Sequence, residues 1–483
     1  MQQSRLVKYI LGMSSREQDL FQQFIHSPYF NQHEKTTHLL DYILKAKSKN
    51  LTKEQVYKKL FPRKPYDEQI LYNTMSYLMK LYHRFLAFQY FEKQPFREQL
   101  YTIEAAYQNR QFDLFKNRAN QLEKSLDKYH IKDSQTYFVR YRLNYLQGMY
   151  KTENHNRANT THFQVMLDNF DKYYLAEKLH HSCNLTGQML VMNTEYNLYF
   201  LEDLMTYLQK NWTAYQKEPA IAGFYTILKM LRDTESDEHY LKLKSMLTET
   251  IGQLSPEAAN ELYTFAFNYC IRQIGAGENQ YQSELFQLYQ QGLSTGALLI
   301  NDVLTEWDYK NITTLGSALK EFVWTEQFLE QYKDKLPEKQ RENAYNYNLA
   351  RFYFSQQLYN ETLSLLLHVQ FTEPQYHLGA TDLLVRSYFA LKNYEALLSL
   401  LETFRIYVIR NKKITTIDKK GYTNYCRFTK RVVLLISSRI TYTRKTYQEK
   451  IKTLKEKIGQ TSNIKYKQWL VRICEQETGV VKV

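Results

Sequence analysis

One short motif in this sequence has the form that presents a nucleophilic serine in many hydrolases. Gly292, Ser294 and Gly296 match the pattern Gly-x-Ser-x-Gly. In a hydrolase a strand precedes this serine and a helix follows it, so that the hydroxyl projects from a strained turn. The residues before Gly292 have the pattern of a helix, and a glycine at a helix C-terminus explains the motif equally well. We therefore expect a helix end here and no catalytic serine.

Histidines occur in two arrangements that could be compared with metal sites. His33 and His38 are five residues apart, which places them about 140° apart on a helix, whereas a zinc-binding helix needs histidines four apart on one face. His180 and His181 are adjacent, so we expect them to point to different sides, as surface residues or in a seam between helices. The sequence therefore predicts no metal site.

The common cofactor-binding patterns do not occur in the sequence. It has no Gly-rich phosphate loop followed by Lys-Ser/Thr and no dinucleotide fingerprint. Its acidic residues are scattered and do not indicate a catalytic pair. None of the four cysteines has Cys-x-x-Cys spacing, which argues against a zinc knuckle or a redox motif: Cys183, Cys270, Cys426 and Cys474. We expect a non-enzymatic protein without a cofactor.

Basic residues are concentrated near the C-terminus. The chain has a formal net charge of +14, and the segment from Arg405 to Arg472 contains 19 basic and three acidic residues, so the rest is close to neutral. Clustered Lys and Arg attract polyanions through their summed field. The residues that we predict to contact a polyanion are Lys419, Lys420, Arg427, Lys430, Arg431, Lys445, Lys450, Lys452 and Lys455.

Three interpretations of this basic end stay open. Its helices could form the polar outer face that closes a repeat array. They could bind nucleic acid, with aromatic side chains stacking on bases: Tyr422, Tyr442, Tyr447, Tyr466 or Trp469. The third interpretation is contact with an anionic membrane surface. It is the least favoured, because the apolar stripes of these helices are needed for packing within the protein. A capping role alone does not explain the charge, so we favour contact with a polyanion or an acidic partner.

Composition and patterning predict helices throughout. The 483 residues include only 14 glycines and eight prolines, but 43 tyrosines, which favours long elements joined by few tight turns. The longest candidate membrane span, Val432–Ile436, is far shorter than the roughly 20 residues that cross a bilayer. We see no signal peptide either, and expect a cytoplasmic protein. One basic-end helix is predicted over 416–437, a second from about 443, and a third carries Trp469.

The first 95 residues are predicted to form a compact helical unit. Ser14 or Ser15, Thr52 and Asp67 are suitable N-caps for three of its helices. The last of these helices is long, which raises the possibility of a DNA-reading helix-turn-helix. Because few basic residues stand at its beginning, where base contacts usually originate, we expect the unit to cap a repeat array instead.

Two stretches in the second half of the chain repeat each other. Tyr353 and Tyr359 recur as Tyr388 and Tyr394, both at a spacing of 35 residues, and Pro374 closes the first stretch. This pattern resembles the tetratricopeptide repeat, or TPR, a helical hairpin with aromatic residues at these places and often a closing proline. The resemblance covers about 70 residues well and implies stacked hairpins.

The whole chain also resembles a group of bacterial helical-repeat proteins without an assigned activity. The resemblance rests on Ser-Pro-Tyr-Phe-Asn at 27–31 and on Leu-Phe-Pro at 60–62 before a long helix. It implies shared ancestry but no biochemical activity. We expect an all-α, TPR-like helical-hairpin superhelix (an α-solenoid) in three segments: an N-terminal helical cap (1–95), a repeat array (96–407) and basic C-terminal helices (408–483).

If the hairpins stack as the TPR resemblance implies, their first helices line a concave groove. Arg351 and Arg386 have the same phase in consecutive repeats, with Phe354 and Phe389 nearby. Guanidinium groups beside aromatic rings suit an acidic or aromatic peptide. The alternative is that both arginines simply extend over the solenoid surface. We expect an interaction or scaffold module that binds an acidic protein segment in this groove; the alternative is an RNA- or ribosome-associated protein that uses the basic end.

Overall fold

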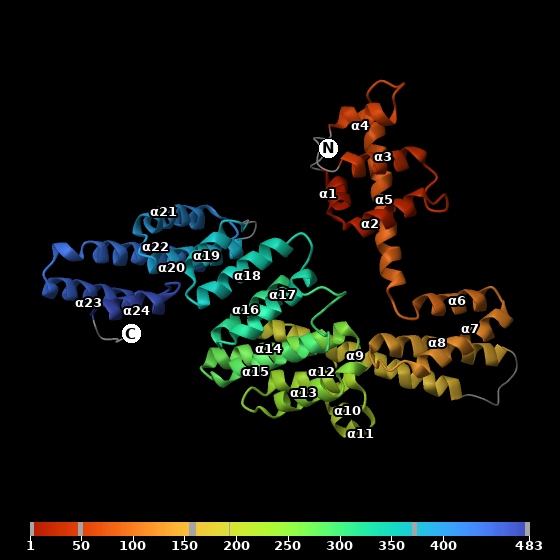
Figure 1. Cartoon of the computed structure of the whole chain (residues 1–483). Coiled ribbons are helices and arrows are strands. Elements are labelled where there is room, and N and C mark those ends of the chain that lie inside the picture. Colours follow the sequence, from red (N-terminus) through yellow and green to blue (C-terminus); the bar gives the residue numbers. More distant parts are fainter. Residues whose placement is uncertain (1–3, 47–51, 154–160, 193, 370–373, 479–483) are drawn as a thin grey trace. The chain divides into compact units, whose positions relative to one another are not determined.

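The computed structural model describes residues 4–46, 52–153, 161–192, 194–369 and 374–478. These residues form 24 α-helices and three short 3₁₀-helices, with no β-strand among them (Figure 1). The prediction of an all-α protein is therefore confirmed. The chain divides into two compact units, residues 1–262 and residues 263–483. The predicted division into three segments stays a prediction.

Unit 1 begins with five helices: α1 (Arg5–Gly12), α2 (Ser15–His26), α3 (Glu34–Ala46), α4 (Lys53–Leu60) and α5 (Glu68–Glu92). Ser14 caps α2 in a capping box with Glu17, and Thr52 and Asp67 cap α4 and α5. The predicted N-caps are thus confirmed. These helices enclose one apolar core that includes Phe21, a residue with no solvent exposure.

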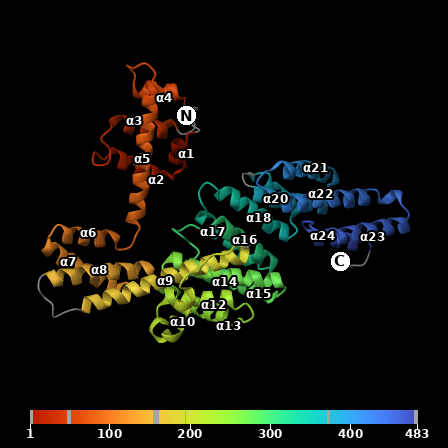
Figure 2. The same ribbon diagram turned by 180° about the vertical axis from the view of Figure 1, so that it is seen from behind.

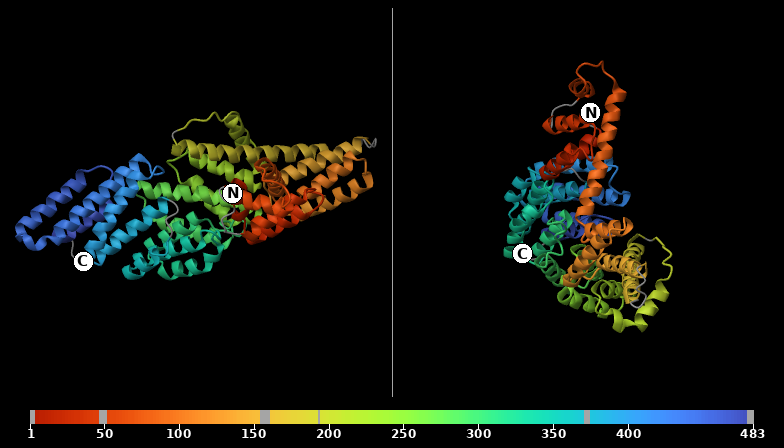
Figure 3. Two further views of the ribbon diagram at one scale, coloured as in Figure 1. Left: turned by 90° about the horizontal axis from the view of Figure 1, so that it is seen from above. Right: turned by 90° about the vertical axis from the view of Figure 1, so that its right-hand side faces the viewer.

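The remainder of unit 1 is built from helices of very different length, from four residues in α11 to 32 in α9. They are α6 (Arg97–Gln108), α7 (Phe112–Lys128), α8 (Ser134–Glu153), α9 (Thr161–Met192), α10 (Leu201–Lys210), α11 (Trp212–Tyr215), α12 (Pro219–Arg232), α13 (Glu238–Glu249) and the first part of α14 (Pro256–Ala276). The helices α8 and α9 lie side by side (Figures 1 and 3). Their close approach requires Gly148, because a Cβ there would lie 2.9 Å from the Phe163 ring. Helix α12 packs against α9 and is buried along most of its length.

Unit 2 contains three successive helical hairpins. After α15 (Gln280–Ser294) they are α16 (Glu306–Ala318) with α17 (Phe322–Tyr332), α18 (Arg341–Ser355) with α19 (Tyr359–Leu366), and α20 (Pro374–Ala390) with α21 (Tyr394–Arg410). The first helices contact one another in order, α16 with α18 and α18 with α20 (Figure 2). Gly379 permits the second contact, because a Cβ there would collide with the hydroxyl of Tyr347.

The three hairpins share one type of joint. Its middle residue has left-handed backbone, with φ of 63° at Lys320, 66° at Gln357 and 58° at Lys392. The next amide then donates to the carbonyl five residues earlier, at 2.9 to 3.0 Å in all three joints. This is the Schellman arrangement that usually places glycine at the left-handed position. Because lysine and glutamine occupy it here, the joints are not recognisable from glycine spacing.

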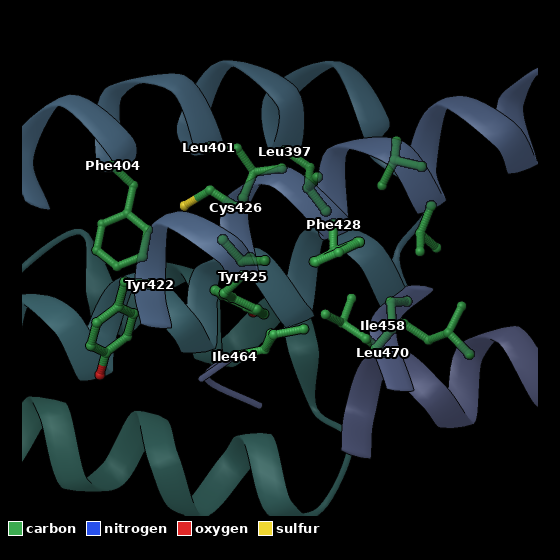
Figure 4. Close-up of a cluster of buried hydrophobic side chains, with 14 of the residues drawn as sticks. Leu397, Leu401, Phe404, Tyr422, Tyr425, Cys426, Phe428, Ile458, Ile464 and Leu470 are labelled. Carbon is green, nitrogen blue, oxygen red and sulfur yellow. The ribbon is translucent and has the colours of Figure 1, made fainter. Parts of the chain in front are cut away.

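The basic end is folded onto the third hairpin. Helix α22 spans Thr416–Ser437, as predicted, and α23 (Arg444–Gln460) and α24 (Lys467–Thr478) follow it. Apolar side chains from α20 to α24 share one core, and Figure 4 shows Tyr425 and Phe428 of α22 within it, together with Leu397, Leu401 and Leu470. The stripes of these helices are therefore used for packing, while their charged residues lie outside.

Candidate functional site

Arg386 is held in a network of side chains from three helices and a loop. Its guanidinium pairs with the carboxylate of Asp382, one turn earlier on α20, with an N–O distance of 2.7 Å. Tyr425 of α22 donates its hydroxyl to the other oxygen of Asp382 at 2.9 Å. The same guanidinium lies 4.6 Å from the ring centroid of Phe354 and 5.2 Å from that of Tyr466. Arg386 and Phe354, both predicted groove residues, are thus brought together.

In this network the charge of Arg386 is compensated by the carboxylate of Asp382. The Asp382 side chain is only 3 % exposed, and burial raises its pKa, while Arg386 and the Tyr425 hydroxyl oppose that rise. A buried carboxylate needs a compensating cation and hydrogen bonds. Arg386 therefore has a structural role, because it neutralises Asp382 and connects α20 with α22.

Arg351 has different surroundings. It is half-buried on α18, and within the described part of the chain its side chain has no ion pair or hydrogen bond. Its neighbour is Lys310 of α16, whose pKa is lowered first by burial and then by the positive charge of Arg351. Arg351 also acts weakly on the pKa of Asp382. Two half-buried cations on the neighbouring first helices α16 and α18 thus repel each other, and sequence reasoning missed one of them, Lys310.

Phe389, the fourth predicted groove residue, faces the C-terminal helices. Its ring lies edge-on to Trp469 of α24, with centroids 5.4 Å apart, and beside Tyr394 at 5.9 Å. It is half-buried against the core of the basic end. Its surroundings are those of a packing residue, away from the pair of Lys310 and Arg351.

The nine predicted polyanion-binding residues do not form a single cluster. Most of them are exposed, whereas Lys419 and Lys455 are half-buried. Lys455 pairs with Glu475 of α24 at 2.8 Å, and the Lys450 ammonium lies 4.9 Å from the Tyr442 ring centroid. They are divided between α22 and α23, and only residues of α22 contribute to the groove described next.

This basic groove has a volume of about 620 Å³ and lies between α21 and α22. Arg405, Arg427, Lys430 and Arg431 line it. Arg405 is paired with Glu402 at 2.8 Å, whereas the other three have no ion pair with any residue that the structure describes. The groove therefore presents three uncompensated cations around a partly apolar floor that includes Leu401.

The expectation that His180 and His181 point to different sides is wrong. Their ring centroids are 4.8 Å apart, and one ligand atom from each lies within 4.8 Å of a carboxylate oxygen of Glu177. Glu261 of α14 approaches from the opposite side, with 2.5 Å between its Oε2 and His180 Nε2. This hydrogen bond raises the pKa of His180. The side chains converge because residues three and four apart on a helix share a face, and Glu177 precedes the two histidines by that spacing.

The other two motifs have ordinary structural surroundings. Ser294 is the last residue of α15, and its hydroxyl donates to the carbonyl of Gln291 at 2.8 Å. A helix precedes the motif, as predicted, so the strained strand-to-helix turn of a hydrolase is not formed there. On α3, His38 pairs with Glu34 at 3.7 Å, and His33 lies edge-on to the ring of Tyr77.

The comparisons with known proteins found no match to this chain, whether with family models, with curated proteins or with solved structures. In the parts of the chain that the structure describes, no helix combines the length and the apolar character needed to cross a bilayer.

Proposed function

We propose that this protein is a non-catalytic interaction module that binds an acidic segment of another protein. The binding face is formed by the first helices α16, α18 and α20. The observation that carries the proposal is that Lys310 and Arg351, half-buried on the neighbouring helices α16 and α18, form no ion pair with an acidic side chain among the described residues, while the charge of Arg351 helps to lower the pKa of Lys310. A carboxylate placed between them would relieve their repulsion.

Support for a TPR-like arrangement comes from the three hairpins. They share one left-handed joint, and their first helices contact one another in order. We infer that α16 to α21 are degenerate repeats and that their first helices line a concave surface, as in tetratricopeptide arrays. Such a surface suits an extended peptide, and its charge decides which peptide binds.

The chemistry of the face favours Asp and Glu side chains. A guanidinium binds a carboxylate through two parallel hydrogen bonds, and an ammonium adds a third charge-assisted contact. Partial burial of Lys310 strengthens this attraction by excluding water. The half-buried ring of Phe354, beside Arg386, would then contact the apolar parts of the peptide.

The test is the binding of a fluorescent Glu-rich peptide, compared with the same peptide carrying Gln at each Glu position. We expect the acidic peptide to bind more tightly, and Arg351→Glu or Lys310→Glu to weaken its binding at least about tenfold. Lys320→Glu is the matched control, since Lys320 is an exposed lysine next to the same first helix and its substitution should change the affinity less than about twofold. Equal binding of the two peptides would contradict the proposal.

A second candidate function, nucleic-acid binding, is favoured by the basic groove. Three uncompensated cations around about 620 Å³ of open space suit a phosphate backbone. Deleting residues from 408 onward would be a poor test, because α22 to α24 bury side chains in a core shared with α21. Neutralisation of the groove by Arg427→Gln, Lys430→Gln and Arg431→Gln is better.

Under this alternative, the intact chain shifts an RNA or DNA probe at low salt. The groove triple variant should then lose roughly two to three units of the slope of log affinity against log salt. Neutralising Lys445, Lys450 and Lys452 on α23 is the control that separates the groove from the general positive charge. An equal loss in both triple variants would exclude the groove as the binding site.

A further inference from the structure

Three side chains on α9 bring ligand atoms close together in unit 1, and a fourth side chain from α14 contacts one of them. Glu177, His180 and His181 of α9 each present one ligand atom within 4.8 Å of the others. Glu261, from the first part of α14, adds an oxygen 2.5 Å from His180 Nε2. The distance from His181 Nε2 to Glu177 Oε2 is 3.4 Å. Two imidazole nitrogens and one carboxylate oxygen of α9 thus lie close enough together to share one metal ion, with Glu261 beside His180.

The surroundings fix the position of the central histidine. The ring of His180 lies against the buried ring of Phe224 from α12, with centroids 5.0 Å apart. The amide of Asn184, one turn later on α9, lies 2.9 Å from His180 Nε2. Because Asn184 and Glu261 both contact Nε2, they would orient the ring through that nitrogen and leave Nδ1 as the nitrogen that binds a metal ion, as orienting side chains do in metal sites.

We propose that Glu177, His180 and His181 bind a zinc ion, with Glu261 orienting His180 and the fourth coordination position open to solvent. Zinc takes four nitrogen and oxygen ligands at about 2.0 to 2.2 Å, so that neighbouring ligand atoms are about 3.3 Å apart. The separation of 3.4 Å between His181 Nε2 and Glu177 Oε2 is close to that value, and the three ligand atoms lie within 4.8 Å of one another, so small side-chain rotations complete the site. Magnesium and calcium are excluded, because they require oxygen ligands throughout.

The site is open to solvent. Glu177, His180 and Glu261 line one wall of a pocket of about 510 Å³ within unit 1, and the His181 side chain is 66 % exposed. A metal ion can therefore enter without unfolding of the chain, as a binding site requires. Once bound, the ion should stabilise unit 1 in proportion to its occupancy.

The experiment is a calorimetric titration of the untagged full chain with zinc chloride after treatment with a chelator. We expect one zinc per chain, with a dissociation constant in the micromolar range or below. His181→Gln and Glu261→Gln should each weaken binding at least about tenfold. Binding no tighter than about 1 mM, or an unchanged affinity in either variant, would overturn the site.

The matched control is His38→Gln. His38 pairs with Glu34 four residues earlier on α3, as His181 does with Glu177, but no second histidine or facing glutamate completes that pair in the described residues. Its substitution should leave zinc affinity unchanged. An equal loss in His38→Gln and His181→Gln would show that zinc binds to isolated surface pairs and would contradict the proposal.

Two further measurements separate loss of the ligand from loss of the fold. Because His181 is mostly exposed, His181→Gln should keep the circular dichroism and the thermal midpoint of the metal-free parent. Zinc should raise the midpoint of the parent but not that of His181→Gln. Cobalt in place of zinc should give the intense visible absorption of a four-coordinate ion, and the pale spectrum of a six-coordinate ion would overturn the assigned geometry.

Discussion

Arg351 and Arg386 have the same position in consecutive hairpins, yet one carboxylate makes their roles different. Asp382 stands four residues before Arg386, at the spacing that allows an ion pair along a helix, and the pair forms at 2.7 Å. The equivalent position before Arg351 is Tyr347. The charge of Arg386 is therefore paired within the protein, whereas Arg351 has no ion pair among the residues that the structure describes.

The first prediction follows from this difference. Arg386→Ala leaves the buried Asp382 without its cation, so the free energy of unfolding of unit 2 should fall by about 2 to 4 kcal/mol. Arg351→Ala relieves a repulsion with Lys310 and should change the free energy of unfolding by no more than about 0.5 kcal/mol. Urea unfolding followed by tryptophan fluorescence measures both values. Equal losses in the two variants would contradict the assigned roles.

A second prediction at the residue scale concerns pH. His377 of α20 stacks on Tyr407 of α21, with ring centroids 3.7 Å apart, and burial lowers its pKa below the ordinary value of 6.5. As the pH falls below that value, the unfolded chain takes up the proton before the folded chain does. The contribution of His377 to stability is therefore present above about pH 6.5 and decreases as the pH falls towards the folded pKa.

His377→Phe keeps an aromatic ring on Tyr407 and removes the titration. Its free energy of unfolding should change less between about pH 8 and pH 5 than that of the parent. The control is His368→Gln, which replaces an exposed histidine and should keep the parental pH dependence. If His377→Phe also keeps that dependence, the pH effect arises elsewhere.

At the scale of elements, the hairpin joints are the least expected feature. Lys320, Gln357 and Lys392 adopt left-handed backbone with φ near 60°, a conformation that costs residues with a Cβ roughly 1 to 2 kcal/mol. The hairpins keep this geometry because the amide after each residue finds its carbonyl partner five residues earlier. The backbone at these joints is therefore locally strained, and the same geometry gives a short, defined connection between the two helices of each hairpin.

The third prediction tests this strain. Gln357→Gly removes the Cβ from an exposed left-handed position and should raise the free energy of unfolding by up to about 1 kcal/mol. Gln356→Gly, one residue earlier in an ordinary backbone conformation, should lower it instead. Thermal unfolding of the two variants gives the comparison, and a loss of stability in Gln357→Gly would be inconsistent with strain at the joint.

At the scale of the whole molecule, the positive charge belongs to folded helices. The apolar stripes of α22, α23 and α24 close the core that begins in α20 and α21. The charged residues are thereby held on fixed faces, and three of them gather at the groove between α21 and α22. Unit 1 contains the separate cluster of Glu177, His180, His181 and Glu261, so the two proposed binding chemistries are located in different units.

The helices and several of their ends could be predicted from the sequence, because caps and apolar periodicity act over a few residues. Thr415 and Asp418 define the start of α22, and the predicted span of 416–437 is confirmed. The joints could not be predicted, since lysine and glutamine do not indicate left-handed backbone. Lys310 was missed because the sequence of its hairpin matches the repeat pattern too loosely to give its register.

The sequence by itself therefore determined the helical class, the inward faces of the basic helices and the location of the net charge. Only the tertiary structure decided which charges are compensated. Tyr425 and Tyr466, both remote in sequence, complete the environment of Arg386, whereas Arg351 forms no ion pair in the described residues and acts on the pKa of Lys310, another cation, and only weakly on that of Asp382. The physical reason is the distance along the chain over which each interaction acts. Helix formation depends on residues within one or two turns. Compensation of a partly buried charge depends on side chains from the helices that pack beside it, which can be remote in sequence.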